Sequence, residues 1–448
     1  MEDGTFMTRK RKNEEDMYGG MARTVDHEQC ARIMELHARI KRPLFIKGPP
    51  GIGKSDLVRQ VGMAEAERMG LEYVEFADNP TAINDLSKYV LIDLRLAQLD
   101  PSDLRGIPWV YAIIENPDTK QKRDIKIGKG KDDAKEGEIS GDLEQIPVSL
   151  LSQYDGWEIL QLVTRWSPPS DLPIRGHGMI FLDEMNLAAE LNMKAAYQLI
   201  LRRCLGEYKV PDGYAILAAG NRIDDMASVT PMPAPLKSRF DWVELRSPSV
   251  EQWTDWASGV GVHPWIIGYL NYKTVALDMF DPQNPVDAQP CPRTWAFASD
   301  ILNDIGTNNL EDVRLMLATA VGIEHANEVF AFIKMRERLP PISEYIRDPM
   351  GARIDFGDTA IVWTLLSALS EKYKSSLGTK QEAKVLNAVL KFCYRIVSPD
   401  VRRPEFAVVF LGMLKSVDKD MRKKVESNKV FLDIADELVV FVGQGFSK

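Results

Sequence analysis

The sequence predicts an α/β fold: a mostly parallel sheet flanked by helices, followed by an all-helical part. Short apolar segments typical of buried strands alternate with helical segments between residues 44 and 245. A glycine-rich loop lies between the first of these strands and a helix. After about residue 247 the strand signals give way to Trp, Leu and Ala at helical spacing, which indicates the helical part.

The elements of the α/β part follow from apolar spacing. A first helix is predicted with Ile33, Leu36 and Ile40 on one face, and the apolar segment 44–46 is a short buried strand. A helix over residues 54–69 follows, and Gly70 is suited to end it. Further strands are expected at 90–96, 179–182, 215–219 and 243–245, and a further helix at 187–205.

This pattern divides the chain into parts. We expect a flexible N-terminal tail over residues 1–24, because the segment is polar and has no periodicity. The α/β core covers residues 25–250, with a polar Lys-, Asp- and Gly-rich insertion near 109–150 that is solvated and is interpreted as a hairpin. A helical part over 251–330 precedes a C-terminal helical domain over 331–448, the two being separated by a polar stretch with prolines near residues 339–349.

Composition excludes several classes of protein. The 448 residues carry a net charge of −9 and are 45% hydrophobic, which is ordinary for a globular protein and argues against nucleic-acid binding by bulk charge. Four well-separated cysteines without a CxxC motif are expected to be reduced thiols of a cytoplasmic protein. The longest apolar runs are too short for a bilayer, which needs roughly 20 residues, so no membrane span is expected.

The glycine-rich loop fits the pattern G-x-x-x-x-G-K-[ST]. Eight consecutive residues match it: Gly48, Pro49, Pro50, Gly51, Ile52, Gly53, Lys54 and Ser55. Glycines let such a loop turn its backbone N–H groups toward phosphates, and the following helix adds its positive N-terminal end. Lys54 is expected to reach the β- and γ-phosphates of a nucleotide, and the Ser55 hydroxyl to ligate Mg²⁺. The alternative is a glycine-rich surface turn.

An acidic pair follows one of the later predicted strands of the α/β core. Asp183 and Glu184 come directly after the apolar segment 179–182. At a strand end beside the phosphate loop, Asp183 would hold Mg²⁺ through a water molecule, and Glu184 would orient or deprotonate an attacking water. Strand ends often carry charge, so an acidic pair alone is weak evidence of a site. The phosphate loop in the same sequence is what favours a nucleotide site.

Three polar residues downstream complete the candidate site. Asn221 follows the strand 215–219 and is expected at the same edge as Asp183, where an amide can polarise water or contact the γ-phosphate; the alternative is an Asx turn. Residues 221–224 also match the guanine-reading pattern N-[KR]-x-D of some GTPases. Those GTPases, however, have an aspartate followed two residues later by a glycine in place of the pair Asp183 and Glu184. Arg239 is a candidate arginine finger and Arg293 a candidate γ-phosphate contact; the alternative for each is a surface arginine.

In this order, these elements resemble the AAA+ ATPases, and within them the MoxR-like branch. Residues 48–55 match the Walker A loop, Asp183 and Glu184 the Walker B pair, and Asn221 the first sensor. Arg239 matches the arginine finger and Arg293 the second sensor. The segments 100–106 and 166–169 also resemble the MoxR-like branch, whereas the stretch between the Walker motifs is unusually long.

The resemblance implies an ATP-hydrolysing subunit of a homo-oligomeric ring, commonly a hexamer, with Mg-ATP at subunit interfaces and residues 251–330 as a helical lid. MoxR-like proteins are similar to chaperones that remodel a partner protein, often one with a von Willebrand factor A domain. Two alternatives stay open. One is a nucleic-acid-dependent motor or loader that uses the basic residues Lys120, Lys122, Arg123, Lys126, Lys129 and Lys131; the other is a nucleotide-sensing scaffold that hydrolyses little.

Overall fold

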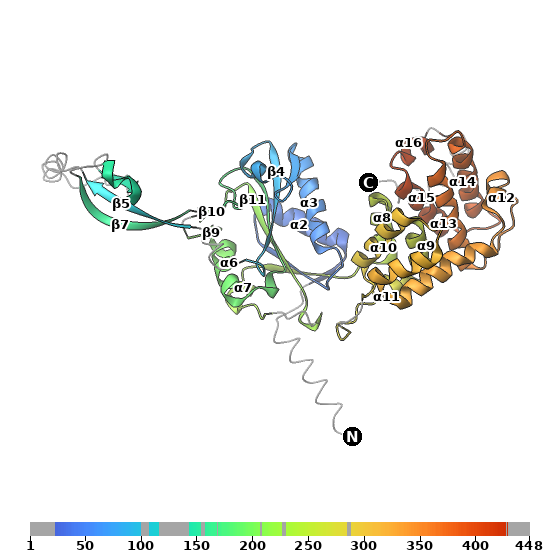
Figure 1. Ribbon diagram of the computed structural model, residues 1–448, viewed down its shortest axis with the longest axis horizontal. Helices are drawn as coiled ribbons and strands as arrows, with labels where there is room; N and C mark the ends of the chain where they lie inside the picture. Colours follow the sequence, from blue (N-terminus) through green and yellow to red (C-terminus); the bar gives the residue numbers. More distant parts are fainter. Residues whose placement is uncertain are drawn as a thin grey trace, which may run out of the picture.

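A computed structural model describes residues 23–99, 107–115, 143–153, 157–167, 169–206, 208–225, 230–284, 288–426 and 428. Its centre is a parallel seven-stranded sheet with the strand order β1-β12-β2-β11-β8-β4-β3. The strands of this sheet are β1 (Arg23–Val25), β2 (Leu44–Lys47), β3 (Glu72–Glu75), β4 (Lys88–Arg95), β8 (His177–Asp183), β11 (Tyr214–Gly220) and β12 (Asp241–Leu245). Helices flank this sheet and a helical region follows it, which confirms the predicted fold class (Figure 1).

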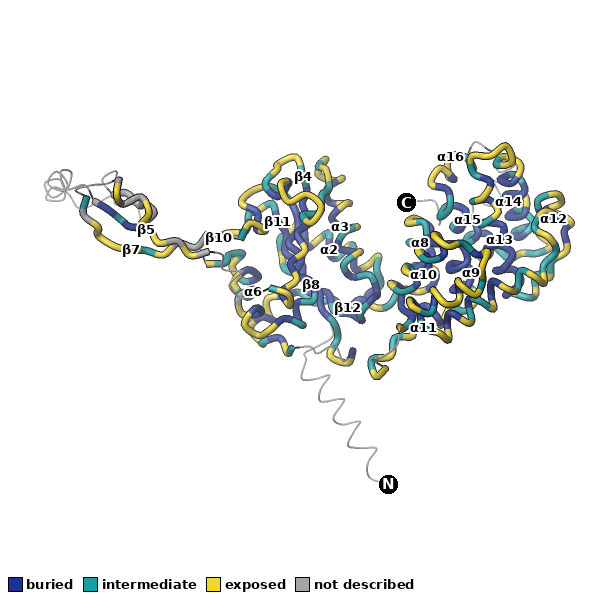
Figure 2. The backbone as a smooth tube through the Cα atoms, in the orientation of Figure 1, coloured by how far each residue is buried: buried dark blue, intermediate teal, exposed yellow. Residues whose placement is uncertain are grey.

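Helices cover both faces of the sheet. One face packs against α2 (His27–Ile40) and α3 (Lys54–Met69), and the other packs against α6 (Glu190–Arg202). A short helix, α7 (Ala234–Lys237), precedes the last strand. With helices on both faces, β8 and β11 are buried along almost their whole length, which explains their unbroken apolar sequences (Figure 2).

The first predicted helix is present, but the apolar face identified from the sequence is not the face that it buries. Leu36 and Ile40 are 48% and 55% exposed, and the helix instead buries Cys30, Met34 and Ala38. Residues 23 and 24 also differ from the prediction, because they form β1 and pair with the edge of β12 rather than belonging to the tail.

Between β4 and β8 the chain forms a separate three-stranded antiparallel sheet in the order β6-β5-β7. Its strands are β5 (Ile107–Glu115), β6 (Leu143–Pro147) and β7 (Glu158–Ser167). Figure 1 shows this sheet projecting from the core on the side opposite the helical region. Residues 116–142, most of the predicted polar insertion, lie outside the described residues. A further two-stranded pair, β9 (Cys204–Leu205) and β10 (Tyr208–Lys209), follows α6.

The helical region has one continuous core. Its helices are α8 (Val250–Val260), α9 (Pro264–Tyr272), α10 (Pro292–Ile305), α11 (Leu310–Lys334), α12 (Ile342–Arg347), α13 (Thr359–Ser376), α14 (Glu382–Val397), α15 (Pro404–Val417) and α16 (Met421–Glu426). A single cluster of buried apolar side chains runs from Val250 to Val425. The prolines near residue 340 therefore do not mark a break in this core.

Two expectations from composition can be compared with the structure. All four cysteines are free thiols, and three of them are buried. Within the described part of the chain, no helix combines the length and the apolar character needed to cross a bilayer.

Candidate functional site

The site lies where β2, β8 and β11 end, because parallel strands bring their carboxyl ends to one edge of the sheet. Here β2 leads into the phosphate loop. Gly51 and Gly53 adopt positive φ angles of 77° and 91°, which other residues rarely adopt. Gly53 caps α3 without any side-chain hydrogen bond, so the first N–H groups of this helix have no side-chain cap. Such a terminus favours an anion.

Lys54 is buried at the centre of the site, with 8% of its surface exposed. Its Nζ donates to the carbonyl oxygens of Gly48 and Pro49, both at 2.8 Å, and to Asn221 Oδ1 at 3.1 Å. Burial lowers the pKa of Lys54 to about 8, although the carboxylates of Asp183 and Asp225 oppose the shift. The ammonium is thus held beneath the loop, where phosphate oxygens would replace carbonyls as its partners.

Ser55 and Asp183, the two residues that the sequence predicts as magnesium ligands, contact each other. The Ser55 hydroxyl donates to Asp183 Oδ2 at 2.7 Å, and Asp183 is 7% exposed. Among the described residues no group of three or more His, Cys, Asp or Glu side chains could hold a metal ion. One hydroxyl and one carboxylate nonetheless fit Mg²⁺, which usually takes most of its ligands from phosphates and water.

Glu184 occupies a strained turn at the end of β8. Its φ of 50° lies in the left-handed region, which is uncommon for a residue other than glycine and costs about 1–2 kcal/mol. Its backbone N–H donates to Asp183 Oδ1 at 2.9 Å, whereas its carboxylate has no hydrogen-bond or ion-pair partner within the described chain. Strain of this kind is typical of functional positions.

Asn221 follows β11 and contacts Lys54 through the hydrogen bond given above. The next residue, Arg222, donates to both carboxylate oxygens of Asp225, at 2.8 Å for the shortest contact. Asp224, the aspartate of the N-[KR]-x-D pattern, is exposed. The loop after β11 is therefore organised around Asp225, a residue that the pattern does not include.

Arg293 reaches the phosphate loop from the helical region. It lies in the first turn of α10, and its backbone N–H donates to the Gly51 carbonyl at 3.0 Å. Cys291, the N-cap of α10, packs on the same glycine so closely that a β-carbon at position 51 would lie 2.5 Å from its sulfur. The arginine that was expected from the sequence to contact nucleotide therefore sits on a helix joined directly to the loop.

Arg239 stands apart from these residues. It follows α7, its side chain is exposed, and its guanidinium has no hydrogen-bond or ion-pair partner among the residues that the structure describes. Its neighbour Phe240 is buried and packs edge-on against Phe45, with 5.5 Å between ring centroids. Phe240 thus anchors the segment while Arg239 faces outward.

Sequence reasoning missed three residues of the site. Asn186 bonds both backbone groups of Asn221, and His27 Nε2 donates to the Ile52 carbonyl in the loop at 2.8 Å. Asp93 in β4 lies near Asp183, and burial together with that carboxylate raises its pKa. The acidic residue inside a strand was a signal for Asp93, whereas nothing local marks Asn186 or His27.

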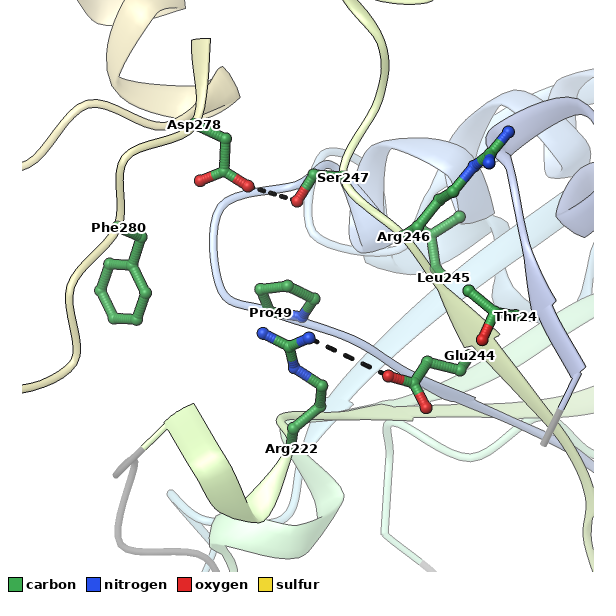
Figure 3. Close-up of a pocket in the computed structure, with 9 residues that line it drawn as sticks. All are labelled: Thr24, Pro49, Arg222, Glu244, Leu245, Arg246, Ser247, Asp278 and Phe280. Atoms are coloured by element: carbon green, nitrogen blue, oxygen red, sulfur yellow. Dashed lines mark hydrogen bonds and ion pairs between the residues drawn. The ribbon is translucent and has the colours of Figure 1, made fainter. Parts of the chain in front are cut away.

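A pocket of about 210 Å³ lies beside the loop, between the core and the helical region (Figure 3). Arg222 and Glu244 face each other within it at 4.0 Å. The Ser247 hydroxyl donates to Asp278 and joins the end of the core to the helical region. The remaining lining residues are Thr24, Pro49, Leu245, Arg246 and Phe280. The pocket marks a second contact between the two parts, next to that of α10.

Comparisons with known proteins do not assign this chain to a family. No protein-family model and no curated protein matches the sequence. Similar solved structures include NtrX from Brucella abortus with ATP, at 11% identity and a TM-score of 0.30, covering 94% of this chain and 72% of that one. NtrX with ADP has 12% identity and a TM-score of 0.29 over the same shares. A Thermotoga maritima RuvB mutant has 11% identity and a TM-score of 0.26, covering 81% and 85%. Scores of this size do not establish a shared fold.

Proposed function

We propose that this chain is an AAA+ ATPase that binds and hydrolyses Mg-ATP. One observation carries the proposal: the edge of the parallel sheet brings Lys54 to Asn221 and Ser55 to Asp183, around an uncapped helix N-terminus. A phosphate chain placed on this loop would meet an ammonium, a hydroxyl and several backbone N–H groups. These are the donors that bind the phosphate oxygens of a nucleoside triphosphate.

Each residue then has a separate task. Lys54 neutralises charge on the β- and γ-phosphates, and Asn221, held against it, contacts the γ-phosphate or polarises the attacking water. Glu184, whose carboxylate has no other partner in the described chain, orients that water and accepts its proton. Ser55 and Asp183 would hold Mg²⁺, Asp183 through water; the ion would supply charge neutralisation between the phosphates.

The assembly belongs to the same proposal. Arg239 faces outward without a partner in the described chain, as expected of a residue that reaches the nucleotide of a neighbouring subunit, so we propose a homo-oligomeric ring, commonly a hexamer in this class. The helical region acts as a lid, with Arg293 contacting the γ-phosphate while α10 rests on the loop. A MoxR-like role in remodelling a partner protein, possibly one with a von Willebrand factor A domain, rests on the sequence resemblance alone.

Phosphate release from Mg-ATP by the assembled protein tests the function. We expect steady hydrolysis by the wild type and a loss of at least about 10²-fold in Lys54→Ala, because the buried ammonium is the main cation facing the phosphates. A matched control is Lys41→Ala: Lys41 donates to the Gly213 carbonyl at the other end of β11 and should leave turnover unchanged. Equal rates in wild type and Lys54→Ala would overturn the proposal.

The nucleic-acid motor remains an alternative that no observation on the described residues favours. Its basic cluster, from Lys120 to Lys131, lies outside the described residues. The ATPase rate with and without single- or double-stranded DNA separates the two functions, since a motor would show strong stimulation that fades as salt is raised.

A further inference from the structure

Asn186 connects the two catalytic segments of the site. It follows the acidic pair in a short 3-10 turn (Met185–Leu187) and is 7% exposed. Its Nδ2 donates to the Asn221 carbonyl at 2.7 Å, and its Oδ1 accepts from the Asn221 N–H at 3.1 Å. One side-chain amide thus satisfies both backbone groups of the residue that contacts Lys54.

The sheet explains why a side chain is needed there. Pairing between β11 and β8 ends at Ala218 and Leu182, because the chain leaves β8 through the left-handed turn at Glu184. Among the described residues, β8 therefore pairs with no residue of β11 beyond Ala218. The Asn186 amide has the donor and acceptor of a peptide group and takes the place of the missing strand.

Two further contacts fix the position of Asn186 against the loop that begins at Asn221. A β-carbon at Gly220 would lie 2.3 Å from Asn186 Oδ1, so glycine at that position lets the amide approach the backbone. At the other end of the same loop, the Thr230 N–H donates to the Asn186 carbonyl at 2.8 Å. Asn186 therefore holds both ends of the segment between Asn221 and Thr230.

We propose that Asn186 is a positioning residue that fixes Asn221 relative to Glu184, and through them the attacking water relative to the γ-phosphate. The inference rests on the proposed ATPase function. Glu184 and Asn186 share one turn, closed by the hydrogen bond from the Leu187 N–H to the Glu184 carbonyl at 2.9 Å, and Asn221 is bonded to that turn through both of its backbone groups. Asn186 touches neither nucleotide nor water in this account and acts only through Asn221.

The first test is Asn186→Ala, which removes both hydrogen bonds. We expect kcat for Mg-ATP hydrolysis to fall by about 10- to 100-fold, as when supporting residues around a reactive site are removed. The Kd for ATP should change by less than about threefold, because Lys54, Ser55 and the loop amides are intact. If Asn186→Ala does not fold, Asn186→Asp replaces it, since that variant keeps the volume and the bond from the Asn221 N–H but sets a carboxylate against the Asn221 carbonyl.

A double-mutant cycle separates positioning from general stability. Because Asn186 acts through Asn221, the variant carrying both Asn186→Ala and Asn221→Ala should have about the kcat of Asn221→Ala alone. The matched control is Asn192→Ala: this asparagine is 3% exposed and its Nδ2 donates to the Leu96 and Leu99 carbonyls, away from Asn221. It should lower the melting temperature while leaving kcat unchanged and showing no coupling to Asn221.

The outcomes are distinguishable. A wild type without ATPase activity refutes the proposed function, whatever the Asn186 variants do. With an active wild type and an inactive Lys54→Ala, three results would each overturn the role of Asn186: wild-type kcat in Asn186→Ala, losses from Asn186→Ala and Asn221→Ala that multiply, or an equal kcat loss in Asn192→Ala.

Discussion

At the scale of the residue, Lys54 gives the site a dependence on pH. Burial lowers its pKa to about 8, so the free protein loses this charge as the pH rises through that value. Phosphates bind the charged form, and ATP affinity should therefore be about tenfold weaker at pH 9 than at pH 7. Calorimetric titration with Mg-ATP across this range measures the change.

Lys54→Arg is the matched control for the pH titration, because a guanidinium stays charged throughout the range. Whatever affinity this variant retains should not vary with pH. A wild-type affinity that is constant or rises between pH 7 and pH 9 would contradict the assignment of the effect to Lys54.

The sequence predicted much of the site at this scale. The motif residues Lys54, Ser55, Asp183 and Asn221 lie together because each follows a parallel strand, and strand ends can be found from apolar runs. Asn186 could not be found in this way, because its partner lies 35 residues further along the chain and the contact depends on where the pairing of β8 with β11 stops. The surroundings of Asp93 likewise depend on which strands are neighbours.

At the scale of the element, α10 packs directly against the phosphate loop, through the hydrogen bond from Arg293 to Gly51 and the contact between Cys291 and Gly51. Gly51→Ala would place a methyl group 2.5 Å from the Cys291 sulfur and should weaken ATP binding by displacing the loop from α10. Adding Cys291→Ala removes the sulfur and should restore part of the affinity. Titration of the single and double variants with Mg-ATP measures both effects.

Gly70→Ala controls for backbone strain in this experiment. Gly70 also has a positive φ, of 68°, but a β-carbon there would meet nothing within 4 Å. The variant should therefore lose about 1–2 kcal/mol of stability and keep its ATP affinity. If the double variant Gly51→Ala, Cys291→Ala binds Mg-ATP no more tightly than Gly51→Ala alone, the contact between α10 and the loop does not govern ATP affinity.

Elements were predicted well where apolar residues cluster and poorly where they do not. The strands β8 and β11 follow from unbroken apolar runs. For α2, helical spacing selected Leu36 and Ile40, yet the sheet covers a face made of Cys30, Met34 and Ala38. His37 is buried on the same helix, where its ring nitrogens bond to the Ile33 carbonyl and to Asp241, and apolar spacing does not reveal such contacts. The projecting sheet of β5, β6 and β7 was expected only as a hairpin, because its long-range pairing has no local signal.

At the scale of the whole molecule, the proposed ring depends on Arg239 acting as an arginine finger on a neighbouring subunit. Arg239→Ala should reduce turnover by about 10³-fold or more if this residue stabilises the γ-phosphate of a neighbour. Mixing it with Lys54→Ala subunits should restore activity, because those subunits cannot bind nucleotide but still supply Arg239. The ATPase rate of mixed rings measures the rescue, and its absence in rings shown to be mixed would contradict a finger acting between subunits.

The organisation of the helical region was harder to predict than that of the core. Prolines near residue 340 indicated two helical parts, whereas one apolar cluster joins helices on both sides of them. A proline ends a helix locally but leaves the packing of the helices before and after it undetermined. The contacts that join this region to the core, from Arg293 to Gly51 and from Ser247 to Asp278, are also tertiary.

The most direct test of ATP hydrolysis at this site is the turnover of Glu184→Gln with Mg-ATP, together with the identity of the nucleotide that it retains. Glutamine keeps the shape of the side chain but cannot accept the proton from water, so we expect wild-type ATP affinity, turnover reduced by about 10²-fold or more, and ATP rather than ADP on the protein. Hydrolysis by Glu184→Gln at the wild-type rate would contradict the account.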